Sequence, residues 1–134
     1  MLYRIYRGGV EGYQRDQAEL VYLVTRLSHI IRAGLDWVAT DRNAAVDARY
    51  TQKADELHSH IDWDIMEAER WANTEDDGFR KQRRMAELLV HRAVPWPVLS
   101  HIYAQNQATV DAVSTFVADQ GHRPAIAVRA QWYF

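Results

Sequence analysis

Glu87 is the residue of this sequence whose position is best suited to chemistry. It lies in the run Arg84-Met85-Ala86-Glu87-Leu88-Leu89-Val90, which otherwise has the composition of a short buried strand. A carboxylate among apolar neighbours costs free energy unless something pairs with it. The basic cluster Arg80–Arg84 overlaps the start of this run, and it could either pair with Glu87 or bind a polyanion. An acid fixed on a strand behind a basic loop is one way to present a catalytic carboxylate to a charged substrate.

A plainer interpretation of the same run is also available. Side chains alternate along a strand, so Glu87 would share one face with Met85 and Leu89. If this strand lies at the edge of a sheet, Glu87 points to solvent and forms an ion pair with a nearby arginine. The residues alone favour this plainer interpretation over the catalytic one.

The histidine pair His58-Ser59-His60, with Asp62 and Asp64 close by, raises the question of a metal site. Its spacing matches no recognised zinc pattern, so we interpret these histidines as surface residues and predict no metal. The other histidines are scattered along the chain, and no Ser/His/Asp arrangement can be argued from them. The sequence therefore gives no support for nucleophilic catalysis.

The length of 134 residues predicts one domain, spanning residues 1–134. The net charge of -2 argues neither for nor against nucleic acid, because the acidic run Glu75-Asp76-Asp77 stands close to the basic cluster. The absence of cysteine excludes disulfides and thiolate metal sites. The sequence has no apolar stretch of membrane-span length and no signal-peptide pattern, so we expect a soluble cytoplasmic protein.

The elements that must position Glu87 follow from apolar periodicity and from turn residues. The run 20–24 is the best candidate for a central strand. Asp62 can cap the helix expected over 63–71. Residues 51–60 are polar and poorly patterned, and we expect a loop over 73–79. The expected strands are 1–6, 20–24, 37–40, 84–90, 101–104 and 125–129. The expected helices are 27–33, 44–50, 63–71 and 107–119, with a single turn at 95–97.

These elements predict an α+β fold with mixed or antiparallel sheets and flanking helices. The strands alternate with helices of very uneven length, which does not suit a regular parallel repeat of strand and helix. The sequence contains neither a dinucleotide-binding fingerprint nor a phosphate-binding loop.

Several short motifs occur in the order and spacing of a known family. They include Thr40-Asp41-Arg42-Asn43-Ala44, Ile61-Asp62-Trp63, Ala86-Glu87-Leu88-Leu89-Val90 and the closing Trp132-Tyr133. With these motifs the chain resembles the DarT family nearly from end to end. Proteins of this family are toxins that transfer ADP-ribose from NAD to a base in single-stranded DNA.

The resemblance implies an ADP-ribosyltransferase fold, built from two small packed sheets with flanking helices. It implies that Glu87 is the catalytic residue and that NAD is the co-substrate. A fixed carboxylate suits this chemistry, because cleavage of the nicotinamide–ribose bond passes through a cationic ribose that the carboxylate can stabilise. The same carboxylate can assist deprotonation of the attacking base.

The resemblance also implies the substrate-binding residues and the partners. The segment from about Asn43 to Glu87 would recognise DNA, with Asn43, Arg49, Lys81, Arg83 and Arg84 as the DNA-binding residues. Aromatic side chains that stack on bases are expected near Glu87. The expected partners are single-stranded DNA and an antitoxin with a macrodomain ADP-ribosyl hydrolase.

Departures from the family pattern lead to further expectations. Met85 stands where the family commonly has glutamine, and Asn43 stands in the turn that often carries histidine. The resemblance places this chain in the C-terminal two-thirds of the family domain, with most NAD-binding residues upstream of Met1, so we expect weak or absent transfer by the chain alone. One alternative is an inactive relative that retains nucleic-acid binding. Another is a transferase that acts on protein or RNA.

Overall fold

The structure is a computed structural model that describes Ile5, residues 7–8, Glu11 and residues 16–133. Contacts between residues divide the chain into two compact units. Unit 1 comprises Met1–Ala33 and Val94–Phe134, and unit 2 comprises Gly34–Ala93. The strand expected over residues 1–6 lies outside the described residues except for Ile5, which is helical.

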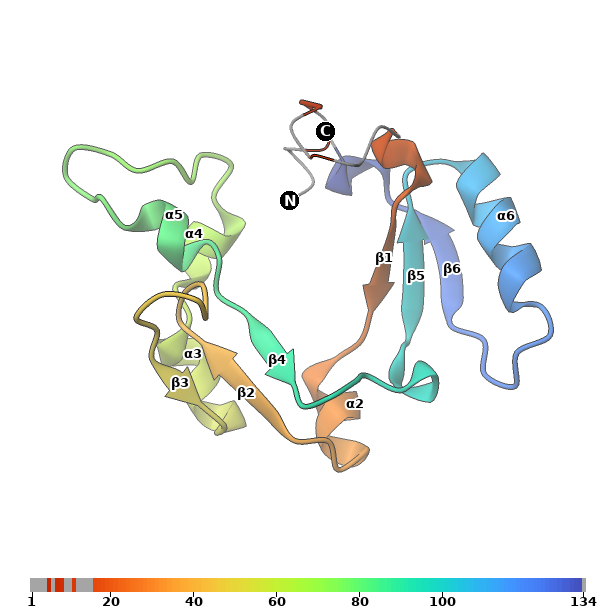
Figure 1. Ribbon diagram of the computed structural model, residues 1–134, viewed down its shortest axis with the longest axis horizontal. Helices are drawn as coiled ribbons and strands as arrows, with labels where there is room; N and C mark the ends of the chain where they lie inside the picture. Colours follow the sequence, from red (N-terminus) through yellow and green to blue (C-terminus); the bar gives the residue numbers. More distant parts are fainter. Residues whose placement is uncertain (1–4, 6, 9–10, 12–15, 134) are drawn as a thin grey trace. The chain divides into compact units, whose positions relative to one another are not determined.

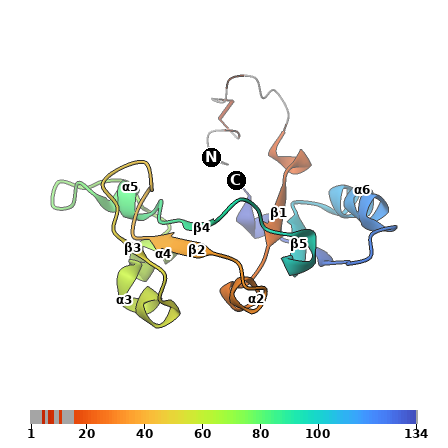
Figure 2. The same ribbon diagram turned by 60° about the horizontal axis from the view of Figure 1, so that its bottom comes forward.

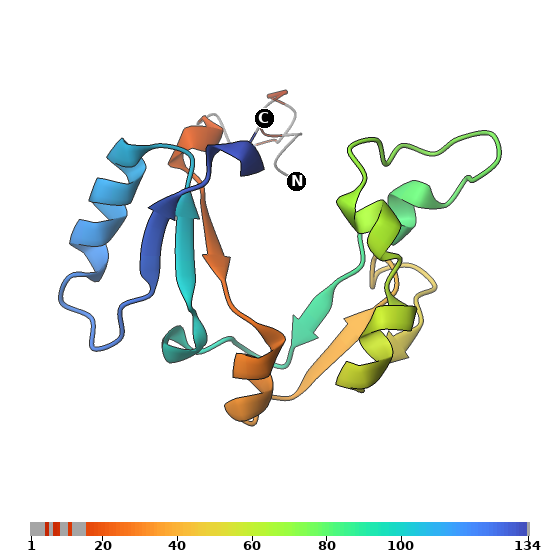
Figure 3. The same cartoon turned by 180° about the vertical axis from the view of Figure 1, so that it is seen from behind.

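Unit 1 is built on a mixed three-stranded sheet with the strand order β1-β5-β6 (Figure 1). Its strands are β1 (Val21–Val24), β5 (His101–Ala104) and β6 (Ala125–Val128). Strand β5 pairs antiparallel with β1 and parallel with β6. Helix α6 (Gln107–Val117) packs against β5 and β6 and lies beside the sheet in Figures 1 and 3. The remaining elements of unit 1 are η1 (Gln17–Glu19), α2 (Leu27–Arg32), η3 (Trp96–Val98) and η4 (Ala130–Trp132).

The core of unit 1 follows from these elements. Ile102 and Ala104 of β5 are 1% and 0% exposed, and Val110 of α6 is buried as well. Asn106 begins α6 by accepting a hydrogen bond at its side chain from the backbone of Thr109, which satisfies one of the free N–H groups of the first turn. One face of α6 and the central strand β5 therefore bury each other's apolar side chains.

The end of the chain folds back onto this sheet through aromatic contacts. The ring of Trp132 lies edge-on to Tyr22 and Tyr103, with ring centroids 5.2 and 4.9 Å away. The hydroxyl of Tyr22 donates to the backbone oxygen of Trp132, and that of Tyr133 donates to the backbone oxygen of Leu20. The closing Trp-Tyr motif thus anchors η4 to strands β1 and β5.

Unit 2 is built on an antiparallel three-stranded sheet with the strand order β3-β2-β4. Its strands are β2 (Trp37–Thr40), β3 (Tyr50–Thr51) and β4 (Leu88–Val90), and Figure 2 shows β2 and β4 running side by side. Its helical elements are η2 (Ala54–Glu56), α3 (Leu57–His60), α4 (Trp63–Glu67) and α5 (Arg80–Arg83). Asp62 caps α4 as expected, because its side chain accepts a hydrogen bond from the backbone of Ile65.

The α+β fold with mixed and antiparallel sheets is confirmed, and the strands near 20–24, 37–40, 101–104 and 125–129 lie where they were expected. Several details were wrong. In the sheet that the described residues form, β1 lies at the edge and β5 at the centre, and Leu23 of β1 is 57% exposed. Helix α4 ends at Glu67 instead of residue 71. The poorly patterned segment 51–60, for which no element was predicted, contains η2 and α3.

A further error concerns the helix expected over 44–50. Residues 44–49 form turns and a bend that lead into β3, because Arg49 is held against Asp41 at the end of β2. Nowhere in the described part of the chain is a helix long and apolar enough to cross a membrane.

Candidate active site

Glu87 lies just before strand β4, not inside a longer strand as the sequence predicted. The Arg80–Arg83 part of the basic cluster forms helix α5, so the strand begins only at Leu88. The backbone of Glu87 is nevertheless fixed against β2. Its carbonyl oxygen accepts a hydrogen bond of 2.8 Å from the backbone nitrogen of Thr40. Its own nitrogen donates to the Thr40 hydroxyl at 3.0 Å, and Thr40 is fully buried.

The carboxylate of Glu87 is held through one of its two oxygens. Oε2 accepts a hydrogen bond of 2.9 Å from the backbone nitrogen of Ala44, which lies 43 positions earlier in the chain. The described residues provide no hydrogen bond to the other oxygen, Oε1. The residue as a whole is exposed, so a ligand can reach the carboxylate.

The turn that carries Ala44 is organised by Asn43. The side-chain oxygen of Asn43 accepts a hydrogen bond of 2.8 Å from the backbone nitrogen of Ala45. Its backbone oxygen accepts a second one, of 3.1 Å, from Val46. This is the local side-chain-to-backbone pattern through which asparagine favours turns over helices. The hydroxyl of Tyr50 donates to the carbonyl oxygen of Ala44 at 3.2 Å, which ties the turn to β3.

Asp41 anchors both ends of this turn. It is 3% exposed, and its carboxylate accepts hydrogen bonds from the side chain of Arg42 and from the backbone and side chain of Arg49. Burial raises the pKa of Asp41, but the bonds from Arg42 and Arg49 outweigh it and lower the pKa to about 2. Arg49, predicted to bind DNA, therefore uses its Nε atom within the protein, although its side chain is 74% exposed.

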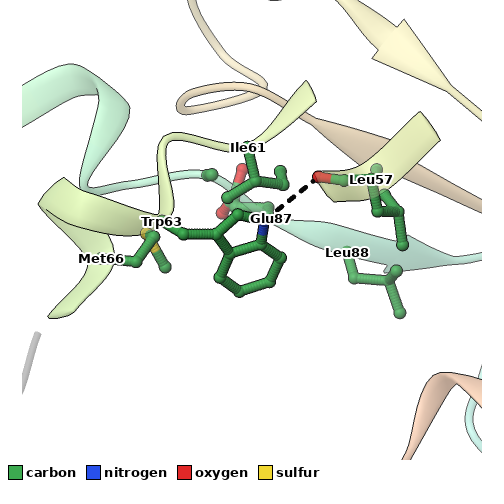
Figure 4. Close-up of a pocket in the computed structure, with 8 residues that line it drawn as sticks. Leu57, Ile61, Trp63, Met66, Glu87 and Leu88 are labelled. Carbon is green, nitrogen blue, oxygen red and sulfur yellow. Dashed lines mark hydrogen bonds between the residues drawn. The ribbon is translucent and has the colours of Figure 1, made fainter. Parts of the chain in front are cut away.

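A pocket of about 190 Å³ opens beside Glu87 in unit 2. Figure 4 shows its lining, with the indole of Trp63 at the centre. The Nε1 atom of Trp63 donates to the backbone oxygen of Leu57 at 3.2 Å, which fixes the ring, and Trp63 remains 44% exposed. The lining residues are Ala39, Leu57, Ile61, Trp63, Met66, Ala86, Glu87 and Leu88. Among these eight residues Glu87 is the one ionisable group, so the pocket combines a flat apolar surface with one carboxylate.

The predicted DNA-binding cations differ in what they contact. Arg83 binds two carboxylates, with Nε 2.7 Å from Asp62 and Nη2 2.5 Å from Asp77. Both bonds raise the pKa of the Arg83 guanidinium, and the bond to Asp77 has the larger effect. Arg84 donates to the backbone oxygen of Met66, a pocket residue. Lys81 is exposed, and its ammonium group contacts no partner among the described residues.

The structure thus brings Asn43 close to Glu87 through the bond of Ala44, holds Arg49 against Asp41, and directs Arg83 into the protein's own ion pairs. Sequence reasoning expected stacking aromatics near Glu87 but did not say which, and the Ile61-Asp62-Trp63 motif held the signal for Trp63. It also missed Thr40, whose role depends on contacts 47 residues away. The described residues contain no group of three or more metal-binding side chains that could hold an ion.

Comparison with known proteins gives this geometry a family context. The family model described as ssDNA thymidine ADP-ribosyltransferase, DarT, matches residues 1–134. Two similar curated proteins carry the name DNA ADP-ribosyl transferase. The one from Thermus sp. 2.9 is 31% identical over 137 residues, and the one from Mycobacterium tuberculosis is 33% identical over 135 residues. Both alignments cover 100% of this chain, but only 63% and 58% of those two proteins.

Solved structures agree with this result. The structure of Thermus sp. 2.9 DarT in complex with NAD⁺ matches with a TM-score of 0.90 and 30% identity, over 99% of this chain and 66% of that one. The same protein in complex with ADP-ribosylated ssDNA matches with a TM-score of 0.90 over 99% of this chain and 63% of that one. Thermosipho africanus DarTG in complex with ADP-ribose has a TM-score of 0.73 at 21% identity, which supports the fold alone.

Proposed function

Because the chain belongs to the DarT family, we propose that it carries the catalytic glutamate of an enzyme that transfers ADP-ribose from NAD⁺ to a thymidine base in single-stranded DNA. The observation that carries this proposal is the state of Glu87. One carboxylate oxygen is fixed by Ala44, and the other has no hydrogen-bond partner among the described residues. The residue also lines an apolar pocket. That is the arrangement expected of a carboxylate held ready for a substrate.

The chemistry assigns Glu87 two tasks. When the bond between the ribose and nicotinamide breaks, nicotinamide leaves with the electron pair and the ribose becomes cationic. A fixed carboxylate stabilises that charge in the transition state. A ring atom of the base then forms the new bond to the ribose, and the proton that the base loses passes to the carboxylate or to water.

We propose that the pocket beside Glu87 receives the target base. Trp63 supports this, because its ring is held by Leu57 and is still 44% exposed, and an aromatic face binds a base by stacking. The base must leave any stack in the DNA to reach the pocket, which explains a single-stranded substrate.

For the DNA backbone we propose contacts from Lys81 and from the exposed parts of Asn43, Arg49 and Arg84, with Arg83 contributing least. Lys81 is the best phosphate ligand of this set, because its ammonium group has no partner among the described residues. Contacts of this kind add affinity that does not depend on base sequence.

The biological role that we propose is that of a toxin paired with an antitoxin that carries a macrodomain ADP-ribosyl hydrolase. The family resemblance supports this role. Because the proposed substrates, NAD⁺ and DNA, are found together inside the cell, we place its action in the cytoplasm.

A transfer assay tests the proposed function. The chain is incubated with NAD⁺ labelled on its adenylate part and with single-stranded oligonucleotides that contain or lack thymidine. We expect label on thymidine-containing DNA, and we expect Glu87→Gln to abolish it. Glu69→Gln is the matched control, because Glu69 is exposed in the same unit and does not line the pocket.

A second sample covers the length of the relatives. The same assay is run on the product translated in frame from upstream of Met1 in the genome. Transfer by either wild-type product that is lost in Glu87→Gln supports the proposal. Absence of transfer by both, with DNA binding intact, would support an inactive DNA-binding relative instead.

A further inference from the structure

The turn beside Glu87 has a feature that the family pattern does not explain. Asn43 was expected to contact DNA, but its side-chain oxygen is bound within the turn, 2.8 Å from the nitrogen of Ala45. The backbone N–H of Ala44, in the same turn, donates to Oε2 of Glu87. The asparagine therefore acts on the carboxylate through the backbone.

We propose that Asn43 is a positioning residue, which holds the 43–46 turn so that the Ala44 amide fixes the Glu87 carboxylate and leaves Oε1 free for the substrate. This inference rests on the proposed function, since it takes Glu87 as the catalytic carboxylate. It assigns Asn43 a role that does not require contact with DNA.

The surroundings of the turn make this role specific. The Thr40 hydroxyl donates to the backbone oxygen of Arg42 at 2.6 Å and accepts from the Glu87 nitrogen, so it joins the start of the turn to the backbone of Glu87. Asp41 closes the other end through Arg49. With both ends fixed, two bonds to Asn43 hold the peptide that carries the Ala44 N–H: one from Ala45 to its side-chain oxygen and one from Val46 to its backbone oxygen.

Free carboxylates rotate, and a base or a cationic ribose needs one that is already in place. A hydrogen bond from a neutral N–H to a carboxylate is among the stronger kinds. Removing it should slow the chemical step on the order of tenfold, which follows from the strength of such bonds. The Michaelis constants for NAD⁺ and DNA should change little.

Two substitutions separate a positioning role from a contact with DNA. Asn43→Ser keeps a short oxygen acceptor that can form the same kind of turn. Asn43→Gln keeps the amide chemistry for a DNA contact, but its longer side chain cannot reach the Ala45 amide in the same geometry. The control is Asn106→Gln, which removes a similar bond to a backbone amide at the start of α6, in unit 1.

The first measurement is the amide resonance of Ala44 in two-dimensional NMR spectra over a pH series. In the wild type and in Asn43→Ser we expect this resonance to move as the Glu87 carboxylate titrates. In Asn43→Gln and in Glu87→Gln we expect it not to move, and in Asn106→Gln we expect the wild-type behaviour. The inference is overturned if the Ala44 resonance of Asn43→Gln still follows the carboxylate.

The second measurement is the rate of transfer. We expect kcat to fall on the order of tenfold in Asn43→Gln and to stay near wild type in Asn43→Ser. A change confined to the Michaelis constant for DNA overturns the inference in favour of a DNA contact. The NMR measurement needs no catalysis, so absence of transfer by the wild type counts against the proposed function and leaves the spectra to decide on Asn43.

Discussion

The Nε atom of Arg83 lies 2.7 Å from a side-chain oxygen of Asp62, the residue whose other oxygen caps helix α4. A second branch of the same guanidinium binds Asp77, in the loop before α5. One arginine therefore joins α5, the start of α4 and the 73–79 loop. Its charge is matched within unit 2, which distinguishes it from the exposed Lys81 nearby.

This contrast predicts that two substitutions affect different properties, one the stability of the protein and the other its binding of DNA. Arg83→Ala should lower the free energy of unfolding by about 1 kcal/mol, because two carboxylates lose their shared partner. Lys81→Ala should leave stability unchanged and weaken DNA binding. The slope of log affinity against log salt should fall by about 0.7, the value for one phosphate contact to a single strand. Urea unfolding and fluorescence anisotropy with a thymidine oligonucleotide measure the two quantities. A reduced salt slope without loss of stability in Arg83→Ala would contradict the assignment.

Asp41 predicts a dependence of stability on pH. Its pKa in the folded protein is about 2, below the ordinary value of 3.8. The stabilisation that it contributes is therefore complete above about pH 4 to 5 and is lost as the pH falls through 2. The size follows from the pKa difference and is about 2 kcal/mol.

Urea unfolding at pH 7, 4, 3 and 2 tests this dependence. Asp41→Asn should be less stable than the wild type at pH 7 and should lose less stability between pH 4 and 2. Asp119→Asn, at an exposed position in unit 1, should keep the slope of the wild type. Equal slopes for all three proteins would show that Asp41 does not carry the effect.

Trp63 predicts a graded loss of substrate binding. Trp63→Ala should weaken binding of single-stranded DNA by about 1–3 kcal/mol if the ring stacks on a base. Trp63→Phe should weaken DNA binding less than Trp63→Ala, because phenylalanine keeps an aromatic face. It should still bind more weakly than the wild type, because it lacks the bond to Leu57. Trp71→Ala is the control, because Trp71 belongs to the same unit and does not line the pocket. Fluorescence anisotropy measures the affinities, and an equal loss in the Trp63 and Trp71 variants would reject stacking at Trp63.

Thr40 predicts a loss of stability that depends on its hydroxyl alone. Thr40→Val keeps the shape but leaves the nitrogen of Glu87 and the oxygen of Arg42 without their partner at a fully buried site. We expect a loss of about 1–3 kcal/mol in the free energy of unfolding, measured by urea denaturation. Thr40→Ser should recover most of it. Thr115→Val should change little, because the hydroxyl of Thr115 bonds to its own helix at an exposed position. A loss in Thr40→Ser as large as in Thr40→Val would assign the effect to packing.

Local sequence determined much of this fold. Apolar runs were sufficient to predict β1, β2, β5 and β6, and apolar periodicity was sufficient to predict α6. Alternation and helical spacing are properties of neighbouring residues, so they can be read from the sequence. The cap at Asp62 was also predicted correctly, since a capping side chain bonds to a backbone group three residues away. Glu87 was identified as a candidate for the same reason, because it is an acid in an apolar run of neighbouring residues.

What the sequence did not determine depends on contacts between distant residues. The expected helix over 44–50 was overruled by the bonds of Asp41 to Arg49 and of Glu87 to Ala44, the second spanning 43 residues. Arg83 was expected to bind DNA, and only the folded chain brings Asp62 and Asp77 to it. Residue types showed which groups could react. Tertiary structure decided which of them are already paired, because pairing depends on distances that neighbours in sequence do not set.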